Sequence, residues 1–214
     1  MMNFTPFVND IKDSFTKEQL KTFEQIKDYK NVQLASMGSN DTEGYQIFTP
    51  DFIVKQMIEA VGDDILDFDK TILEPTSGDG AFTTYIYRKR LETINDNFEI
   101  NSLKALSTIY SIEMDKELII KQRDNIYTLA KLFIEDNHIE VDDSYYEMLK
   151  CMITTNFIWA MFNSDREIDA GFFGAEVAYK MPEAEKHKLK SISFPVWDIS
   201  ENNVEIHYEE AEII

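Results

Sequence analysis

The segment from Ile72 to Phe82 constrains the fold of this 214-residue chain more than any other. It begins in a short apolar run, Thr71–Leu73, which fits a buried strand, and it leads into Phe82–Leu91, which has the composition of a helix with basic residues in its last turns. Between them, Gly78 and Gly80 let the backbone turn sharply and approach a ligand without a Cβ in the way. A glycine pair often only turns the chain, but its place between a strand and a helix favours a ligand-binding loop.

A second strand and helix follow the first. The stretch Leu106–Met114 contains Thr108–Ile112, a run rich in β-branched and aromatic residues that ends at Glu113, and Asp115–Phe133 has the spacing of a long amphipathic helix. We expect the polar stretch Asn95–Asn101 to be a loop. Strand, loop, helix, strand and helix in this order form a βαβ unit, whose crossover predicts a parallel sheet. The predicted fold class is therefore α/β and Rossmann-like, with a parallel-dominated sheet.

The chain before this unit is expected to be helical. Apolar residues at helical spacing between residues 10 and 30 predict one or two helices, and a polar break follows at residues 36–44. We therefore predict an N-terminal helical extension over residues 1–44 and a main domain over 45–214. Within that domain, Thr49 and Pro50 suit the start of a helix over Asp51–Val61.

The pattern beyond residue 150 is weaker. Residues 152–162 fit either a strand or a buried helix, and both readings stay open. Residues 191–194 and 204–208 have the alternation of strands, with turn-forming residues at 201–203.

Charge sets a limit on the partners of this chain. Its net charge is −19, and the stretches 135–149 and 201–214 contain acids but no base. DNA-binding domains usually carry a basic patch, because neutralising phosphates supplies much of their affinity. The acidic surface is either simply solvated, or it repels or imitates nucleic acid.

Composition also bounds the location and the chemistry. A lone cysteine, Cys151, fits a reducing cytoplasm, and neither a signal peptide nor an apolar run long enough for a bilayer is visible. We therefore expect a cytoplasmic protein without membrane contact. The three histidines, His138, His187 and His207, lack ligand spacing, so we predict no metal site.

The acids around the glycine loop indicate which ligand it suits. A pyrophosphate would be repelled by Glu74 and Asp79, whereas a ligand with an ammonium, a sulfonium and a ribose would tolerate or use them. S-adenosylmethionine (SAM) carries these groups. Glu113, at the end of the second strand, can accept hydrogen bonds from both ribose hydroxyls. Alternatively, Glu113 and Asp115 cap the following helix, and the two roles are compatible.

Three stretches together resemble a known family. Gln46-Ile47-Phe48-Thr49-Pro50, Leu73-Glu74-Pro75-Thr76-Ser77-Gly78-Asp79-Gly80-Ala81-Phe82 and Ser111-Ile112-Glu113-Met114-Asp115 resemble, in content and order, the adenine-N6 DNA methyltransferases of restriction-modification systems. The resemblance implies a SAM-dependent methyltransferase fold with SAM as cofactor and DNA as partner. The cofactor-binding residues that it implies are Phe48, Thr49, Pro50, Glu74, Thr76, Gly78, Asp79, Gly80, Phe82 and Glu113.

The catalytic motif of that family is missing. The family uses N/D/S-P-P-Y/F/W to hold the adenine amino group and to stack on the flipped base, but this chain has no Pro-Pro pair. The nearest stretch is Phe194-Pro195-Val196-Trp197, in which Phe194 cannot accept a hydrogen bond. Pro195 and Trp197 are the candidate catalytic residues on this basis, and Trp197 is equally well a core or edge aromatic.

Three functions remain open from the sequence. The chain is a DNA adenine methyltransferase of phage or mobile-element type, acting alone or with a partner subunit. Alternatively, it is a SAM-binding accessory subunit without chemistry of its own, or an acidic decoy or anti-restriction protein. Assembly into a homo- or hetero-oligomer would allow a neighbouring chain to supply the missing catalytic residues.

Overall fold

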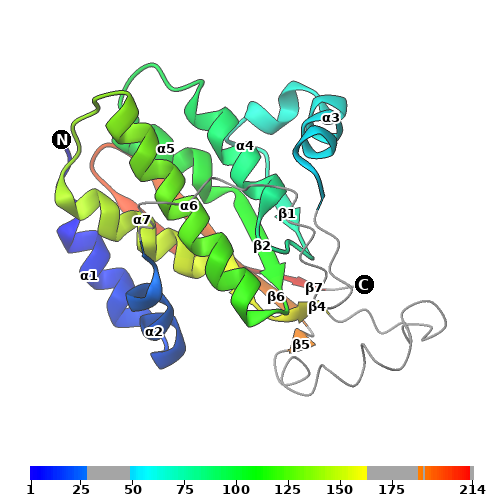
Figure 1. The fold of residues 1–214 in the computed structure, drawn as a ribbon. Helices are drawn as coiled ribbons and strands as arrows, with labels where there is room; N and C mark the ends of the chain where they lie inside the picture. Colours follow the sequence, from blue (N-terminus) through cyan, green and yellow to red (C-terminus); the bar gives the residue numbers. More distant parts are fainter. Residues whose placement is uncertain (28–48, 163–187, 190, 213–214) are drawn as a thin grey trace.

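The computed structural model of the chain describes residues 1–27, 49–162, 188–189 and 191–212. Helices come first along the chain, pairs of helices then separate β1, β2 and β3, and the last described elements are strands (Figure 1). They are α1 Thr5–Ser14, α2 Lys17–Gln25, α3 Asp51–Val61, the 3-10 helix η1 Asp63–Leu66, β1 Ile72–Glu74, α4 Ala81–Leu91, α5 Phe98–Ser107, β2 Ile109–Glu113, α6 Lys116–Asp136, α7 Asp143–Asn156, β3 Phe157–Trp159, β4 Met161–Phe162, β5 Lys188–Leu189, β6 Ser191–Ile199 and β7 Val204–Glu212.

A small parallel sheet lies at the centre of the fold. Its strand order is β1-β2-β3, with Ile72 beside Ile109 and Ser111 beside Phe157. All five residues of β2 are buried, as expected for a middle strand that is covered on both faces. The predicted α/β class with a parallel sheet is confirmed, and this sheet has three strands.

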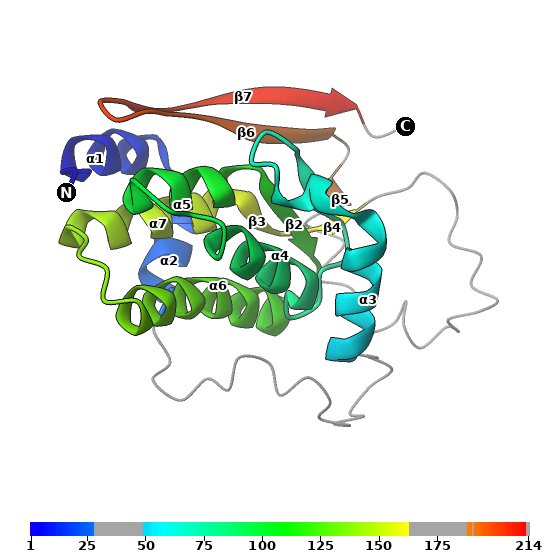
Figure 2. The same cartoon turned by 90° about the horizontal axis from the view of Figure 1, so that it is seen from above.

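The two faces of the sheet are covered by different kinds of structure. On one face, Ser111 of β2 donates a hydrogen bond to Gln122 of α6, and α4 packs beside α6. On the other face, the hydroxyl of Tyr110 donates to the carbonyl of Pro195 in β6 over 2.6 Å, and the rings of Tyr110 and Phe194 pack edge to face. Figure 2 shows the β6–β7 hairpin on one side of the sheet and α4 and α6 on the other.

The N-terminal helices pack onto the same core as the sheet. Phe4, Val8 and Phe23 are buried in one hydrophobic cluster with the residues of α5, α6 and α7. The backbone N–H of Phe4 donates to Ser144 Oγ at the start of α7 over 2.7 Å. The predicted boundary between an extension and a main domain, at residues 44 and 45, lies outside the described residues.

Several local predictions are confirmed and others are wrong. Helix α3 covers the predicted residues and has Gly62 as its C-cap, but its N-cap is Pro50 rather than Thr49. The predicted loop at Asn95–Asn101 is wrong, because helix α5 begins there at Phe98. Residues 152–162 contain the end of α7 and then two short strands, β3 and β4. Strand β6 continues through Pro195, so the two predicted C-terminal strands form a longer antiparallel hairpin.

None of the helices in the described part of the chain has both the length and the apolarity that crossing a membrane requires.

Candidate functional site

The glycine loop is attached to the carboxyl end of β2. The loop connects Glu74, the last residue of β1, to Ala81, the first of α4. The backbone N–H of Ser77 donates to the carbonyl of Ile112 over 3.1 Å, and the N–H of Gly78 donates to the Glu113 carboxylate over 2.7 Å. The carboxyl ends of β1 and β2 therefore meet at one place, which is where open α/β sheets bind ligands.

The two glycines of the loop have different roles. Both have positive φ angles, 58° at Gly78 and 84° at Gly80, a conformation that side chains other than glycine rarely adopt. A Cβ at Gly80 would lie 2.4 Å from Cγ of Gln122, whereas a Cβ at Gly78 would meet nothing within 4 Å. Gly80 is therefore needed for close packing of the loop on α6. Gly78 leaves its backbone open to the approach of a ligand.

Gln122, on α6, holds the glycine loop in place through its side-chain hydrogen bonds. This fully buried side chain accepts hydrogen bonds from Ser77 Oγ and Ser111 Oγ over 2.9 and 3.0 Å, and its amide donates to Thr83 Oγ1 over 2.8 Å. It therefore joins the loop, β2 and α4. Sequence reasoning missed Gln122, although a polar residue on the apolar side of an amphipathic helix was a signal that could have found it.

Asp79 is held from α6 as well. Lys121 forms a salt bridge with Asp79 over 2.8 Å, and the Asn125 side chain donates to the carbonyl of Asp79 over 3.3 Å. These contacts attach the loop to α6, so its conformation is fixed before any ligand binds.

Glu113 serves both the loop and the following helix. One of its carboxylate oxygens accepts from Gly78, and the other accepts from the N–H of Asp115 over 2.8 Å. Asp115 is the N-cap of α6 and accepts from Glu117 and Leu118. The capping alternative is thus confirmed for Asp115. Each Glu113 oxygen accepts one hydrogen bond in these contacts and retains a lone pair for a further donor.

Glu74 is the most perturbed acid of the loop. Burial, a hydrogen bond from the Thr83 backbone that acts in the opposite direction, and the charges of Glu113 and Asp79 together raise its pKa from the ordinary value of 4.5 to about 8, and burial is the largest cause. Its Oε2 atom is buried and has no hydrogen-bond partner. At neutral pH this carboxyl is therefore mostly protonated, and a cation placed beside it would draw it into the charged form.

The other predicted cofactor residues lie around this loop or outside the described part. Thr76 is exposed, and Phe82, in the first turn of α4, is half-buried against the hydrophobic core. Thr49 and Pro50 lead into α3, which packs beside α4. Phe48 lies outside the described residues.

The two candidate catalytic residues lie elsewhere. Trp197 is 9% exposed, and its indole N–H donates to Asn156 over 2.9 Å. The Asn156 amide donates in turn to the carbonyls of Leu106, Ser107 and Ile109, at the amino end of β2. The glycine loop lies at the carboxyl end of that strand. The structure thus does not bring Trp197 to the loop, and Pro195 uses its carbonyl to hold Tyr110.

Comparison with known proteins adds no assignment. Searches against protein family models, curated proteins and solved structures find no match for this chain. Its function is therefore argued from the geometry of the site.

Proposed function

We propose that this chain binds SAM at the carboxyl ends of β1 and β2, and that it is the SAM-binding part of a DNA adenine-N6 methylation system with a Rossmann-like methyltransferase fold. Two features support this. Parallel strands β1 and β2 are joined through a glycine loop and a helix, and an acid stands at the end of the second strand. The order β1-β2-β3 is that of one half of a doubly wound sheet.

The observation that carries the proposal is the group of three acids around the loop. The charges of Asp79 and Glu113 both act on Glu74, and Lys121 is the basic side chain paired with Asp79. In the described part of the chain, no group of three or more His, Cys, Asp or Glu side chains is placed to hold a metal ion. An organic cation therefore suits the site better than a metal, and the ammonium and sulfonium of SAM are two positive groups on one ligand.

Each of these acids would contact a different part of SAM. Glu74 and Asp79 would face the ammonium end, and the open side of Gly78 would let the ligand approach the backbone. Glu113 would accept from the ribose hydroxyls with its remaining lone pairs. SAM supplies an electrophilic methyl group when it is bound.

Methyl transfer is assigned to a partner rather than to the described residues. Transfer requires an acceptor for the adenine amino group close to the sulfonium. Strand β1 is the edge of the described sheet, and Pro195 and Trp197 are occupied in packing. A second subunit, or a second copy of this chain, would complete the catalytic site and contact DNA.

Calorimetric titration with SAM tests the proposal. The wild-type chain should bind SAM, and Glu113→Gln should weaken binding about tenfold or more, because it replaces a carboxylate acceptor by a weaker one. The matched control is Glu117→Gln, which removes an exposed acid from the first turn of the same helix. Absence of SAM binding by the folded wild-type chain would refute the proposal, as would equal losses in the two variants.

A second candidate function, the acidic decoy, rests on a separate observation. Glu135 and Asp136 at the end of α6, and Glu140 between α6 and α7, are exposed in a protein of net charge −19. A decoy would inhibit a restriction enzyme or a methyltransferase without SAM. Reversing these three charges should then abolish inhibition, and it spares Asp142, which caps α7. Inhibition that survives the reversal would eliminate this candidate.

A further inference from the structure

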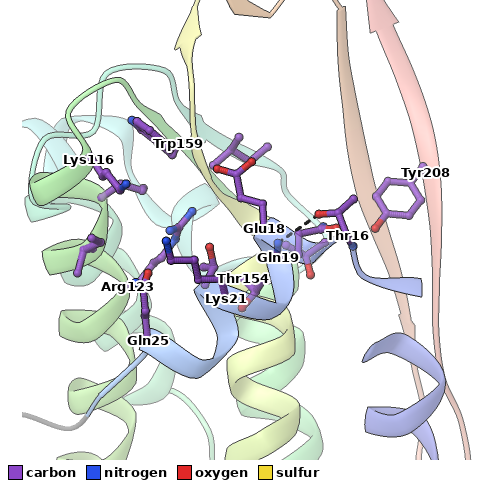
Figure 3. A pocket seen from close by; sticks show the side chains of 15 residues that line it. Thr16, Glu18, Gln19, Lys21, Gln25, Lys116, Arg123, Thr154, Trp159 and Tyr208 are labelled. Atoms are coloured by element: carbon purple, nitrogen blue, oxygen red, sulfur yellow. Dashed lines mark hydrogen bonds between the residues drawn. The ribbon is translucent and has the colours of Figure 1, made fainter. Parts of the chain in front are cut away.

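A cavity lies away from the glycine loop, at the outer edge of the sheet. It has a volume of about 260 Å³ and is bounded by α2, α6, α7, β3 and Tyr208 of β7 (Figure 3). We call it the α2–α6 pocket. Its size suits a small metabolite rather than a macromolecule.

The charges in this pocket differ from those of the rest of the molecule. Lys21, Lys116 and Arg123 line it, together with one acid, Glu18. The whole chain has about two acids for each base, at 40 to 21, so this excess of bases is local. An anion entering the pocket would leave an acidic surface for a basic one, which favours binding there.

Arg123 is a buried donor with unused capacity. It is 7% exposed, and its Nε and one terminal nitrogen both donate to the single carbonyl of Phe157, over 3.0 and 2.6 Å. A guanidinium has five N–H groups, so three remain for a ligand. Burial lowers the pKa of Arg123 to about 10, which still leaves it charged at neutral pH.

Thr154 supplies a second unused polar group. It lines the same pocket at 5% exposure, and its hydroxyl has no hydrogen-bond partner. A buried hydroxyl without a partner is costly, and a ligand oxygen would satisfy it. Figure 3 shows Lys21, Arg123 and Thr154 near one another, with Trp159 and Lys116 beyond them.

The pocket and the glycine loop use opposite sides of α6. Lys116, Ile119, Ile120 and Arg123 line the pocket, whereas Lys121, Gln122 and Asn125 contact the loop region. At 3.6 residues a turn these two sets face away from each other. A ligand in the pocket is therefore separate from SAM.

We propose that the α2–α6 pocket binds a small phosphomonoester. Lys21, Arg123 and Thr154 hold the phosphate, because a dianion suits several basic groups and a hydroxyl donor together. The organic part lies against Trp159. The Nζ atom of Lys116 lies over this indole, 4.7 Å from the ring centroid. This proposal does not depend on SAM binding at the loop.

The test is calorimetric titration of the full chain at fixed ionic strength with ribose 5-phosphate, inorganic phosphate and ribose. The ester should bind, inorganic phosphate should bind more weakly, and ribose should not bind. Lys21→Glu should weaken binding of the ester about tenfold or more, and Thr154→Val should weaken it severalfold without loss of thermal stability, because no hydrogen bond within the protein is removed. Lys17→Glu is the matched control, since Lys17 is exposed on the same helix and outside the pocket.

Three results would overturn this proposal. The first is absence of ester binding by the folded chain, and the second is an equal loss of binding in Lys17→Glu and Lys21→Glu. The third is binding of inorganic phosphate as tight as that of the ester, which would show that the organic part contributes nothing to the affinity. Ester binding that is unchanged in Glu113→Gln supports a site separate from the loop, whatever the outcome for SAM.

Discussion

Arg90, on α4, holds the region around the sheet together through its guanidinium. It is fully buried and donates five hydrogen bonds of 2.7 to 3.0 Å, all to uncharged acceptors. The acceptors are the carbonyls of Ile65, Asp67, Lys70 and Ala105 and the hydroxyl of Thr108. These groups belong to the segments that enter β1 and β2, so one side chain positions the amino ends of both strands.

Replacing Arg90 by lysine should strongly destabilise the protein. Lysine keeps the charge but has three donors without the planar arrangement, so buried carbonyls lose their partners. We expect Arg90→Lys to lower the free energy of unfolding by about 3 kcal/mol or more. Urea denaturation measures this, with Arg88→Lys, at a less buried position on the same helix, as control. Similar midpoints for the two variants would contradict the assigned role.

Glu74 should make stability depend on pH in an unusual direction. Its pKa is about 8 in the folded protein against an ordinary 4.5, so the folded state retains a proton that the unfolded chain has lost. The contribution of this group to stability is therefore greatest below pH 4.5 and falls as the pH rises to about 8.

Glu74→Gln should remove this dependence, because glutamine remains neutral. At pH 8 the variant should be more stable than the wild type by about 4 kcal/mol, and near pH 4 the two should be equal. Thermal unfolding at several pH values measures the difference. Parallel stability curves for the two proteins would contradict the burial of this carboxyl.

The β6–β7 hairpin packs on a surface that the sequence did not predict. It lies across the face of the sheet opposite α4 and α6, held by the hydrogen bond from Tyr110 to the Pro195 carbonyl. The alternation of polar and apolar residues predicted strands here, but not the surface on which they pack. The resemblance to a catalytic motif directed attention to Pro195 and Trp197, which the structure places in this packing.

Tyr110→Phe tests how the hairpin is attached. The substitution leaves the ring in place but removes the donor to a buried carbonyl, so stability should fall by about 1–2 kcal/mol. SAM binding should be unchanged, because Tyr110 points away from the loop side of β2. Chemical denaturation and SAM titration of the same sample check both parts. A loss of SAM affinity with stability unchanged would show that the hairpin belongs to the site.

The elements that could be predicted are those with simple periodicity and clear ends. Helix α3 ends at a glycine and α6 begins at a capping aspartate, and both were visible in the sequence. Helix α5 was missed because it has no clean polar face, with both Ser102 and Ala105 fully buried. Its N-cap is Asn97, which has a positive φ angle and makes no side-chain capping hydrogen bond. The α2–α6 pocket was beyond prediction, since its residues come from elements far apart in the chain.

The whole molecule combines a small parallel sheet with an unusually acidic surface. Three acids meet at the loop, and one of them is held protonated by burial at neutral pH. The same burial that destabilises the empty protein prepares it for a cation, because a positive ligand stabilises the charged carboxylate. Glu74→Gln should therefore stabilise the empty protein and weaken SAM binding, two effects of one cause.

Proton release on SAM binding tests most directly whether the ligand binds against Glu74. Binding should lower the pKa of Glu74, so the calorimetric heat at neutral pH should depend on the ionisation enthalpy of the buffer. Affinity should rise by up to about tenfold per pH unit between about pH 5.5 and 6.5, below the range in which the ligand's own amino group titrates. Both effects should disappear in Glu74→Gln. Heats independent of buffer, or an affinity that does not change with pH in the wild type, would contradict the claim that SAM binds against this carboxyl.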